Sequence, residues 1–134
     1  MKSLLFLLSI TMMVLAVAGC SDTNEATGDM NEMTAAELQE EVEGSGMDET
    51  VNYIDVREED EFASSHIEGF ENIPMGELMD DASQLPKDEE IVILCNTQNR
   101  SIQVGESMIE QGYDANNITI VMGGISDYEG EKVE

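Results

Sequence analysis

The chain has 134 residues, of which 30 are Asp or Glu and 5 are Lys or Arg, and its formal net charge at pH 7 is -25. This length is sufficient for one ordinary domain and little else. Nucleic acid is excluded as a partner, because such a surface repels a polyanion and no basic stripe in the sequence offsets that repulsion. An anionic lipid surface is disfavoured for the same reason.

The N-terminus differs from the rest of the chain. After Lys2, residues 4–18 form an apolar stretch broken only by Ser9 and Thr11. This stretch has the length of a signal peptide and is shorter than the about 20 residues of a membrane span. It ends in Val-Ala-Gly-Cys20, which resembles the lipobox of bacterial lipoproteins. We therefore predict a signal peptide over 1–19, a lipidated (for example palmitoylated) Cys20, and an extracytoplasmic protein anchored to the membrane through this lipid. An ordinary signal peptide or a short anchor helix is the alternative.

Residues 20–33 are predicted to form the lipidated cysteine and a flexible acidic tether, since this segment is polar and lacks apolar periodicity. A short strand at 30–33 is a weaker possibility. The domain is predicted to span 34–134. Its first helix is indicated by Thr34 and Glu37, which have the spacing of a capping box and precede an apolar helical face.

Apolar runs at 51–56, 91–94 and 118–122 predict β-strands, the last two of a type buried on both faces. Helical spacing of apolar residues predicts a helix over 75–85 and another from about residue 100 to Gly112. Methionines 75, 79, 108 and 122 are predicted to be core residues. This alternation indicates a single α/β domain with a mostly parallel sheet, whose ligand site lies at the carboxyl ends of the strands.

Lipidation of Cys20 would leave Cys95 without an intramolecular disulfide partner. Cys95 could be a core residue, form an intermolecular bridge or act as a nucleophile. It directly follows the strand 91–94, and a helix is predicted to begin at Arg100 or Ser101. The amides of such a loop, the helix dipole and the Arg100 guanidinium all favour a thiolate at Cys95.

Four motifs in order along residues 34–133 resemble those of the rhodanese-homology family. They are Asp55-Val-Arg57, His66-Ile-Glu-Gly with Asn-Ile-Pro74, Cys95-x4-Arg100-Ser101, and Gly123-Gly124. The resemblance implies a five-stranded mostly parallel sheet flanked by helices, and a Cys95 that carries sulfane sulfur as a persulfide. It also implies a small-molecule sulfur donor (thiosulfate, a polysulfide or a persulfide) and a thiol or other nucleophile as acceptor.

In this reading Cys95 is the nucleophile and Arg100 the electrostatic clamp of the loop. Ser101 would bond the Cys95 sulfur or cap the helix. Asp55 and Arg57 form either a strand-end brace or a substrate contact, and His66 is predicted to be structural. The residues expected to supply mainly backbone donors are Asn96, Thr97, Gln98 and Asn99. No cofactor is predicted, and no second histidine supports a metal site.

The loop lacks charge between Cys95 and Arg100, whereas loops of thiosulfate-using members of this family often carry extra Arg or Lys. A polysulfide or low-molecular-weight persulfide is therefore at least as plausible a donor as thiosulfate. A non-catalytic binding or redox-sensing module is the alternative function, which the intact Cys-x4-Arg spacing disfavours.

Overall fold

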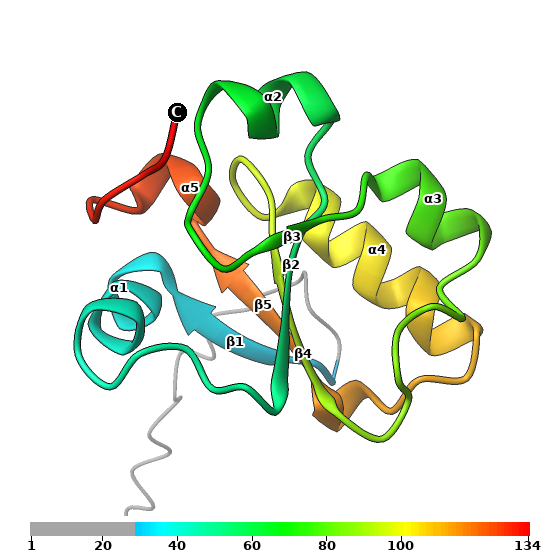
Figure 1. Cartoon of the computed structure of the whole chain (residues 1–134). Coiled ribbons are helices and arrows are strands. Elements are labelled where there is room, and N and C mark those ends of the chain that lie inside the picture. The colour runs from blue at the N-terminus through cyan, green and yellow to red at the C-terminus, as the bar shows by residue number, and fades with distance from the viewer. Residues whose placement is uncertain (1–28) are drawn as a thin grey trace, which may run out of the picture.

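The computed structural model describes residues 29–134, so the predicted signal peptide, Cys20 and most of the predicted tether lie outside the described residues. The elements, labelled in Figure 1, are β1 (Asn31–Thr34), α1 (Ala35–Glu43), β2 (Val51–Asp55), α2 (Glu59–Ser64), β3 (Glu71–Asn72), α3 (Met75–Asp80), β4 (Glu90–Leu94), α4 (Asn99–Glu110), a 3-10 turn (Ala115–Asn117), β5 (Ile118–Met122) and α5 (Gly124–Asp127). In this part of the chain no helix is long and apolar enough to cross a membrane.

The strands form one five-stranded sheet in the order β1-β5-β4-β2-β3, and every neighbouring pair is parallel. This confirms the predicted α/β class with a parallel sheet. β4 is the central strand, and its register aligns Val92 with Tyr53 of β2 and with Thr119 of β5. Because all strands run in the same direction, the segments that follow them meet at one edge of the sheet.

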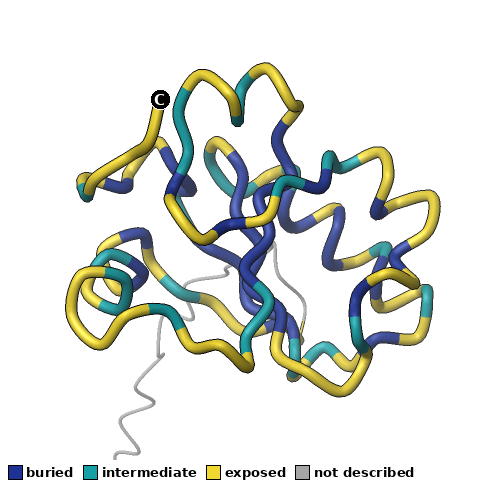
Figure 2. Tube along the Cα trace, in the orientation of Figure 1, coloured by how far each residue is buried: buried dark blue, intermediate teal, exposed yellow. Residues whose placement is uncertain are grey.

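Alternate residues of β4 enter two separate core layers. Ile91 and Ile93 pack in the layer covered by α3 and α4, whereas Val92 and Leu94 pack in the layer covered by α1 and α5. Burial on both faces explains the unbroken apolar run of this strand. Figure 2 shows the buried trace concentrated along the sheet, and α2 lies beyond the carboxyl ends of the strands.

The start of α1 confirms the predicted capping box. The amide of Glu37 donates to Oγ1 of Thr34 at 3.2 Å, and the amide of Thr34 donates to Oε2 of Glu37 at 2.8 Å. The sheet, however, begins before the predicted domain boundary at residue 34. β1 pairs with β5 along its whole length and Met30 is buried, so residues 30–33, assigned mainly to the tether, belong to the domain.

The helix predicted over 75–85 is shorter than its apolar spacing suggests. α3 ends at Asp80 because Asp81 is extended and its carboxylate accepts from the amide of Ser83 in a local turn. Met79, predicted to be a core residue, is 41% exposed. Ala82 and Leu85 are buried as predicted, but they reach the core from a turn.

Candidate active site

The loop 95–100 joins the central strand β4 to α4 at the carboxyl edge of the sheet. Cys95 has a free thiol and is 1% exposed, so it lies at the floor of the loop. This burial disfavours the intermolecular bridge considered above. The predicted strand-to-helix junction is confirmed, with α4 beginning at Asn99.

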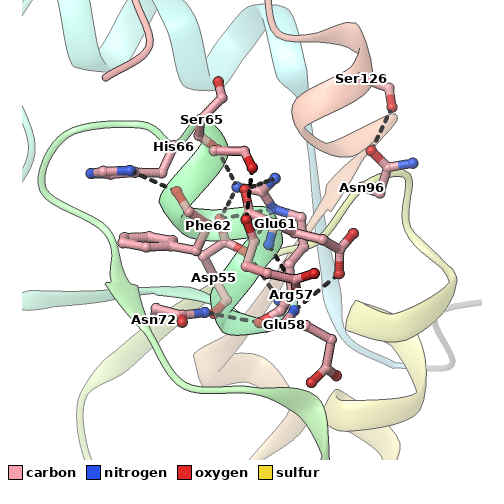
Figure 3. A network of polar contacts seen from close by, with 12 residues as sticks. Asp55, Arg57, Glu58, Glu61, Phe62, Ser65, His66, Asn72, Asn96 and Ser126 are labelled. Carbon is pink, nitrogen blue, oxygen red and sulfur yellow. Dashed lines mark hydrogen bonds and ion pairs between the residues drawn. The ribbon is translucent and has the colours of Figure 1, made fainter. Parts of the chain in front are cut away.

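The start of α5 binds the outward-facing carbonyl groups of the loop. The amide of Ile125 donates to the Cys95 carbonyl at 2.9 Å, and the amide of Ser126 donates to the Asn96 carbonyl at 3.0 Å. The hydroxyl of Ser126 also donates to the side-chain oxygen of Asn96 at 3.1 Å, as Figure 3 shows. The loop is thus held from outside by a different element of the sheet.

These contacts orient the loop amides. In a trans peptide the carbonyl and the N–H point in opposite directions, so the amides of Asn96 and Thr97 face away from α5. Within residues 29–134, no hydrogen bond uses the amides of Asn96, Thr97 or Gln98 as donors. The amides of the first turn of α4 lack intrahelical acceptors by the geometry of a helix. The loop therefore has free N–H groups suited to an anionic atom near Cys95.

Gly124 is the residue that permits this close approach. It has a φ of 56°, and a Cβ built on it would lie 2.3 Å from the Thr97 carbonyl oxygen, 2.4 Å from that of Cys95 and 2.6 Å from that of Asn96. All three atoms belong to the backbone of the loop, so the loop itself would have to move. The Gly-Gly motif therefore shapes the loop from outside.

Replacing Gly124 with alanine is expected to displace the loop. A left-handed conformation costs a residue with a Cβ about 1–2 kcal/mol, and the clash adds to this cost. We expect a loss of about 3 kcal/mol or more in the free energy of unfolding. Urea denaturation monitored by circular dichroism measures it.

Gly76 offers a matched control, since its Cβ would meet nothing within 4 Å and it lies inside helix α3. Gly76→Ala is expected to be neutral or to stabilise by up to about 1 kcal/mol. Equal effects of the two substitutions would contradict the role given to Gly124.

Arg100, predicted to be the clamp of the loop, forms an ion pair with Glu61 of α2. Nη1 donates to Oε2 at 2.6 Å and Nη2 donates to Oε1 at 2.8 Å. The two side chains are 27% and 35% exposed, and pairs of this kind contribute about 0–1 kcal/mol to stability. Sequence reasoning did not identify Glu61, which is 39 residues away in an acidic run and carries no distinguishing spacing.

The charge of this pair persists at ordinary pH. Hydrogen bonds from Arg100 lower the pKa of Glu61 from 4.5 to about 2, despite some opposing desolvation. Since the folded-state pKa is below the unfolded one, the stabilisation is complete above pH 4.5 and is lost only as the pH falls toward 2. The Glu61 hydrogen bonds also raise the pKa of Arg100, against some desolvation by burial. Both members of the pair are therefore charged at neutral pH.

Asp55 and Arg57 form the brace that was one of their two predicted roles. Nη2 of Arg57 lies 2.7 Å from Oδ2 of Asp55, and both residues are buried. Nη2 also donates to the Ser65 carbonyl at 2.7 Å and Nη1 to the Glu61 carbonyl at 3.3 Å (Figure 3). Asn72 donates to the carbonyls of Asp55 and Arg57. This network fastens the C-terminal end of α2 to the end of β2.

His66 has the contacts of a structural residue. Its Nδ1 lies 2.9 Å from the Phe62 carbonyl oxygen, which can only accept, so Nδ1 carries the hydrogen. Its ring stacks on that of Phe62 at 4.0 Å, and its backbone exchanges two hydrogen bonds with Val133. These contacts join α2 to the C-terminal segment.

Ser101 neither caps α4 nor bonds the Cys95 sulfur, so the structure shows neither of its two predicted roles. Gln98 is the N-cap and its side chain accepts from the amide of Gly123 at 3.3 Å. Ser101 is fully buried, and its hydroxyl has no hydrogen-bond partner in the described part of the chain. A buried hydroxyl without a partner is costly, so it is available for a ligand.

A parallel α/β domain with a buried thiol at the floor of a loop of free amides is suited to holding an anionic adduct on that thiol. The chain matches the Rhodanese-like domain family over residues 34–131, and it belongs to this family. It is 35% identical over 103 residues to "Putative sulfurtransferase YtwF" of Bacillus subtilis, covering 77% of this chain and 94% of that protein.

A second relative and a solved structure agree with this assignment. The chain is 30% identical over 113 residues to "Putative sulfur carrier protein YrkF" of Bacillus subtilis, covering 84% of this chain but only 58% of the longer relative. A rhodanese-related protein from Thermoplasma volcanium superposes with a TM-score of 0.63 at 28% identity, covering 77% of this chain and 97% of that structure.

Proposed function

We propose that this protein is a sulfurtransferase that carries sulfane sulfur as a persulfide on Cys95 and passes it to a thiol or another nucleophile. The observation that carries the proposal is the buried Cys95 thiol at the base of a loop whose Asn96, Thr97 and Gln98 amides have no acceptor within residues 29–134. Relatives named as a sulfurtransferase and as a sulfur carrier support the same chemistry.

The first half-reaction begins with the Cys95 thiolate, which attacks the outer sulfur of the donor. A bond forms between Sγ and that sulfur, the donor's sulfur–sulfur bond breaks, and the leaving group departs with the electron pair, as a thiolate from a persulfide or as sulfite from thiosulfate. The negative terminal sulfur of the persulfide is then stabilised by the free amides of the loop and by the N-terminus of α4. We assign the buried Ser101 hydroxyl, which has no hydrogen-bond partner among the described residues, as a further donor to this sulfur.

The second half-reaction returns Cys95 to its starting state. An acceptor thiolate attacks the terminal sulfur, a new sulfur–sulfur bond forms on the acceptor, and the Cys95 thiolate is the leaving group. The loop amides that stabilise the terminal sulfur of the persulfide also stabilise the negative charge on the departing Cys95 sulfur. The same loop therefore serves both half-reactions.

The test is intact-mass measurement after incubation with inorganic polysulfide, followed by peptide mapping. We expect the mass to rise by one sulfur atom on the Cys95 peptide, and a thiol acceptor to remove that sulfur. A Cys95 that never gains sulfur would favour the non-catalytic module instead.

We also propose that Cys20 carries lipid and that the domain acts outside the cytoplasm. The apolar stretch ending at Val-Ala-Gly-Cys20 supports this proposal. Labelling of expressing bacteria with an alkyne fatty acid is expected to mark the wild type and not Cys20→Ser. Equal labelling of both proteins would overturn the anchor.

A further inference from the structure

The chain after Cys20 has few basic residues that could attract an anionic donor. They are Arg57, Lys87, Arg100 and Lys132. Lys87 donates to the Gln111 carbonyl just after the C-terminal end of α4, and Lys132 lies over the Tyr128 ring. Arg57 is paired with buried Asp55. Among the described residues, Arg100 is therefore the cation left to act on a donor at the loop.

The guanidinium of Arg100 is already hydrogen-bonded to another side chain. Both of its outer nitrogens donate to the two carboxylate oxygens of Glu61. The negative charge of Glu58 also raises the pKa of Arg100, so a second carboxylate acts on the same guanidinium. The pair is neutral as a unit, and its hydrogen-bonding fork faces Glu61 instead of the loop.

The surface at the start of α2 is acidic as well. A groove of about 590 Å³ lies between the start of this helix and the start of α3. Its lining residues are Glu58, Glu59, Asp60, Pro74, Gly76 and Glu77. This surface therefore adds no cation that could bind a dianionic donor.

We propose that Glu61 determines the donor specificity of the loop. By occupying both outer nitrogens of Arg100, it withdraws that cation from the donor and favours low-molecular-weight persulfides over the thiosulfate dianion. This inference rests on the proposed sulfurtransferase function. Neutral amides can stabilise the single terminal sulfur that a persulfide delivers, whereas a free guanidinium would strengthen the binding of the thiosulfate sulfonate.

The persulfide step needs no further reactant. The Cys95 thiolate attacks the terminal sulfur of R–S–SH, the sulfur–sulfur bond of the donor breaks, and R–S⁻ leaves with the electron pair. The proton of the terminal sulfur passes to solvent or to the departing thiolate. The products are the Cys95 persulfide and the thiol R–SH.

The experiment compares the loading of Cys95 by two donors, thiosulfate and the persulfide of 2-mercaptoethanol. The second-order rate constant for persulfide formation is measured by intact mass in wild type, Glu61→Gln and Glu59→Gln. In Glu61→Gln the amide oxygen can keep the bonds made by Oε2 from Arg100 and from the Glu58 amide, while the amide nitrogen opposes Nη2 and frees it.

We expect Glu61→Gln to raise the ratio of thiosulfate to persulfide loading by about tenfold, because a free unit charge close to a dianion acts at low effective dielectric. Glu59→Gln removes the same charge from an exposed position of the same helix and is expected to change the ratio by less than about twofold. Circular dichroism checks that both variants are folded. A purely structural role of Glu61 would change both loading rates together and leave the ratio unchanged.

The outcomes separate the two proposals. Loading of wild type by persulfide but not by thiosulfate, together with the expected shift in Glu61→Gln, supports the inference. A ratio that is the same in wild type, Glu61→Gln and Glu59→Gln overturns the inference and leaves the sulfurtransferase function standing. If neither donor loads wild-type Cys95, the proposed function is overturned and the inference with it.

Discussion

Replacing Cys95 with serine is expected to abolish sulfur transfer. Serine has nearly the same shape but does not ionise near neutral pH and cannot carry a persulfide, so both half-reactions lose their central atom. We expect the transfer rate from persulfide to a thiol acceptor to fall by at least about 10³-fold, as for loss of a catalytic nucleophile. A coupled assay of thiol persulfide formation measures this rate.

The transfer rates of Cys95 and of Cys95→Ser are best compared in a protein that also carries Cys20→Ser. The chain has two cysteines, so Cys95 is then its only thiol. The unfolding midpoint of the Cys95→Ser variant shows whether the fold is intact. Retention of more than about a tenth of the transfer rate, which corresponds to a loss below 1.4 kcal/mol in transition-state stabilisation, would contradict the role of Cys95.

Arg57→Ala is expected to have the largest effect on stability. It leaves the Asp55 carboxylate buried without its ion pair, and it removes the donors of the Ser65 and Glu61 carbonyls at the end of α2. Breaking one side of a buried ion pair costs about 3–5 kcal/mol. Urea denaturation is expected to show this loss as a lower midpoint with an unchanged slope.

Lys132→Ala is the control for charge, since it removes one positive charge from an exposed position. The free energy of unfolding of this variant is expected to stay within about 0.5 kcal/mol of the wild-type value. The double variant Asp55→Asn/Arg57→Leu is expected to lose less free energy of unfolding than the two single variants lose in sum. In the double variant neither side chain carries an unpaired charge. Additive losses would contradict the coupling between Asp55 and Arg57.

The elements that could be predicted from local patterns are those whose cause is local. The Thr34 capping box, the apolar run of β4 and the strand-to-helix junction at Cys95 each depend on a few neighbouring residues, and each is present in the structure. The pattern did not reveal that Ala82 and Leu85 reach the core from a turn after α3, because contacts from elsewhere hold this turn. Gln111 accepts from the Ala82 amide, and the Tyr113 hydroxyl donates to the carbonyls of Ala82 and Leu85.

The residues of the site also divide into those that local patterns identify and those that tertiary contacts place. Cys95 and Arg100 could be identified from their spacing, since one loop places both. Glu61 could not, because α2 is brought to Arg100 by the network around Arg57 and by the packing of β2 beside β4. The Gly-Gly motif is evident in the sequence, but its role is not. The structure shows that the carbonyl oxygens of the loop lie against Gly124 and leave no room for a side chain.

The sequence by itself determined the α/β class, the position of Cys95 directly after a buried strand, and the acidity of the domain. These properties follow from hydrophobic periodicity, turn chemistry and composition, which act over short stretches of chain. Only the tertiary structure decided that the cation of the loop is paired with Glu61, that α5 binds the carbonyl groups of the loop from outside, and that Asp55 and Arg57 form a buried brace. Such pairings arise where parallel strands bring distant segments to one edge of the sheet, and their energies depend on burial and distance that no local pattern encodes.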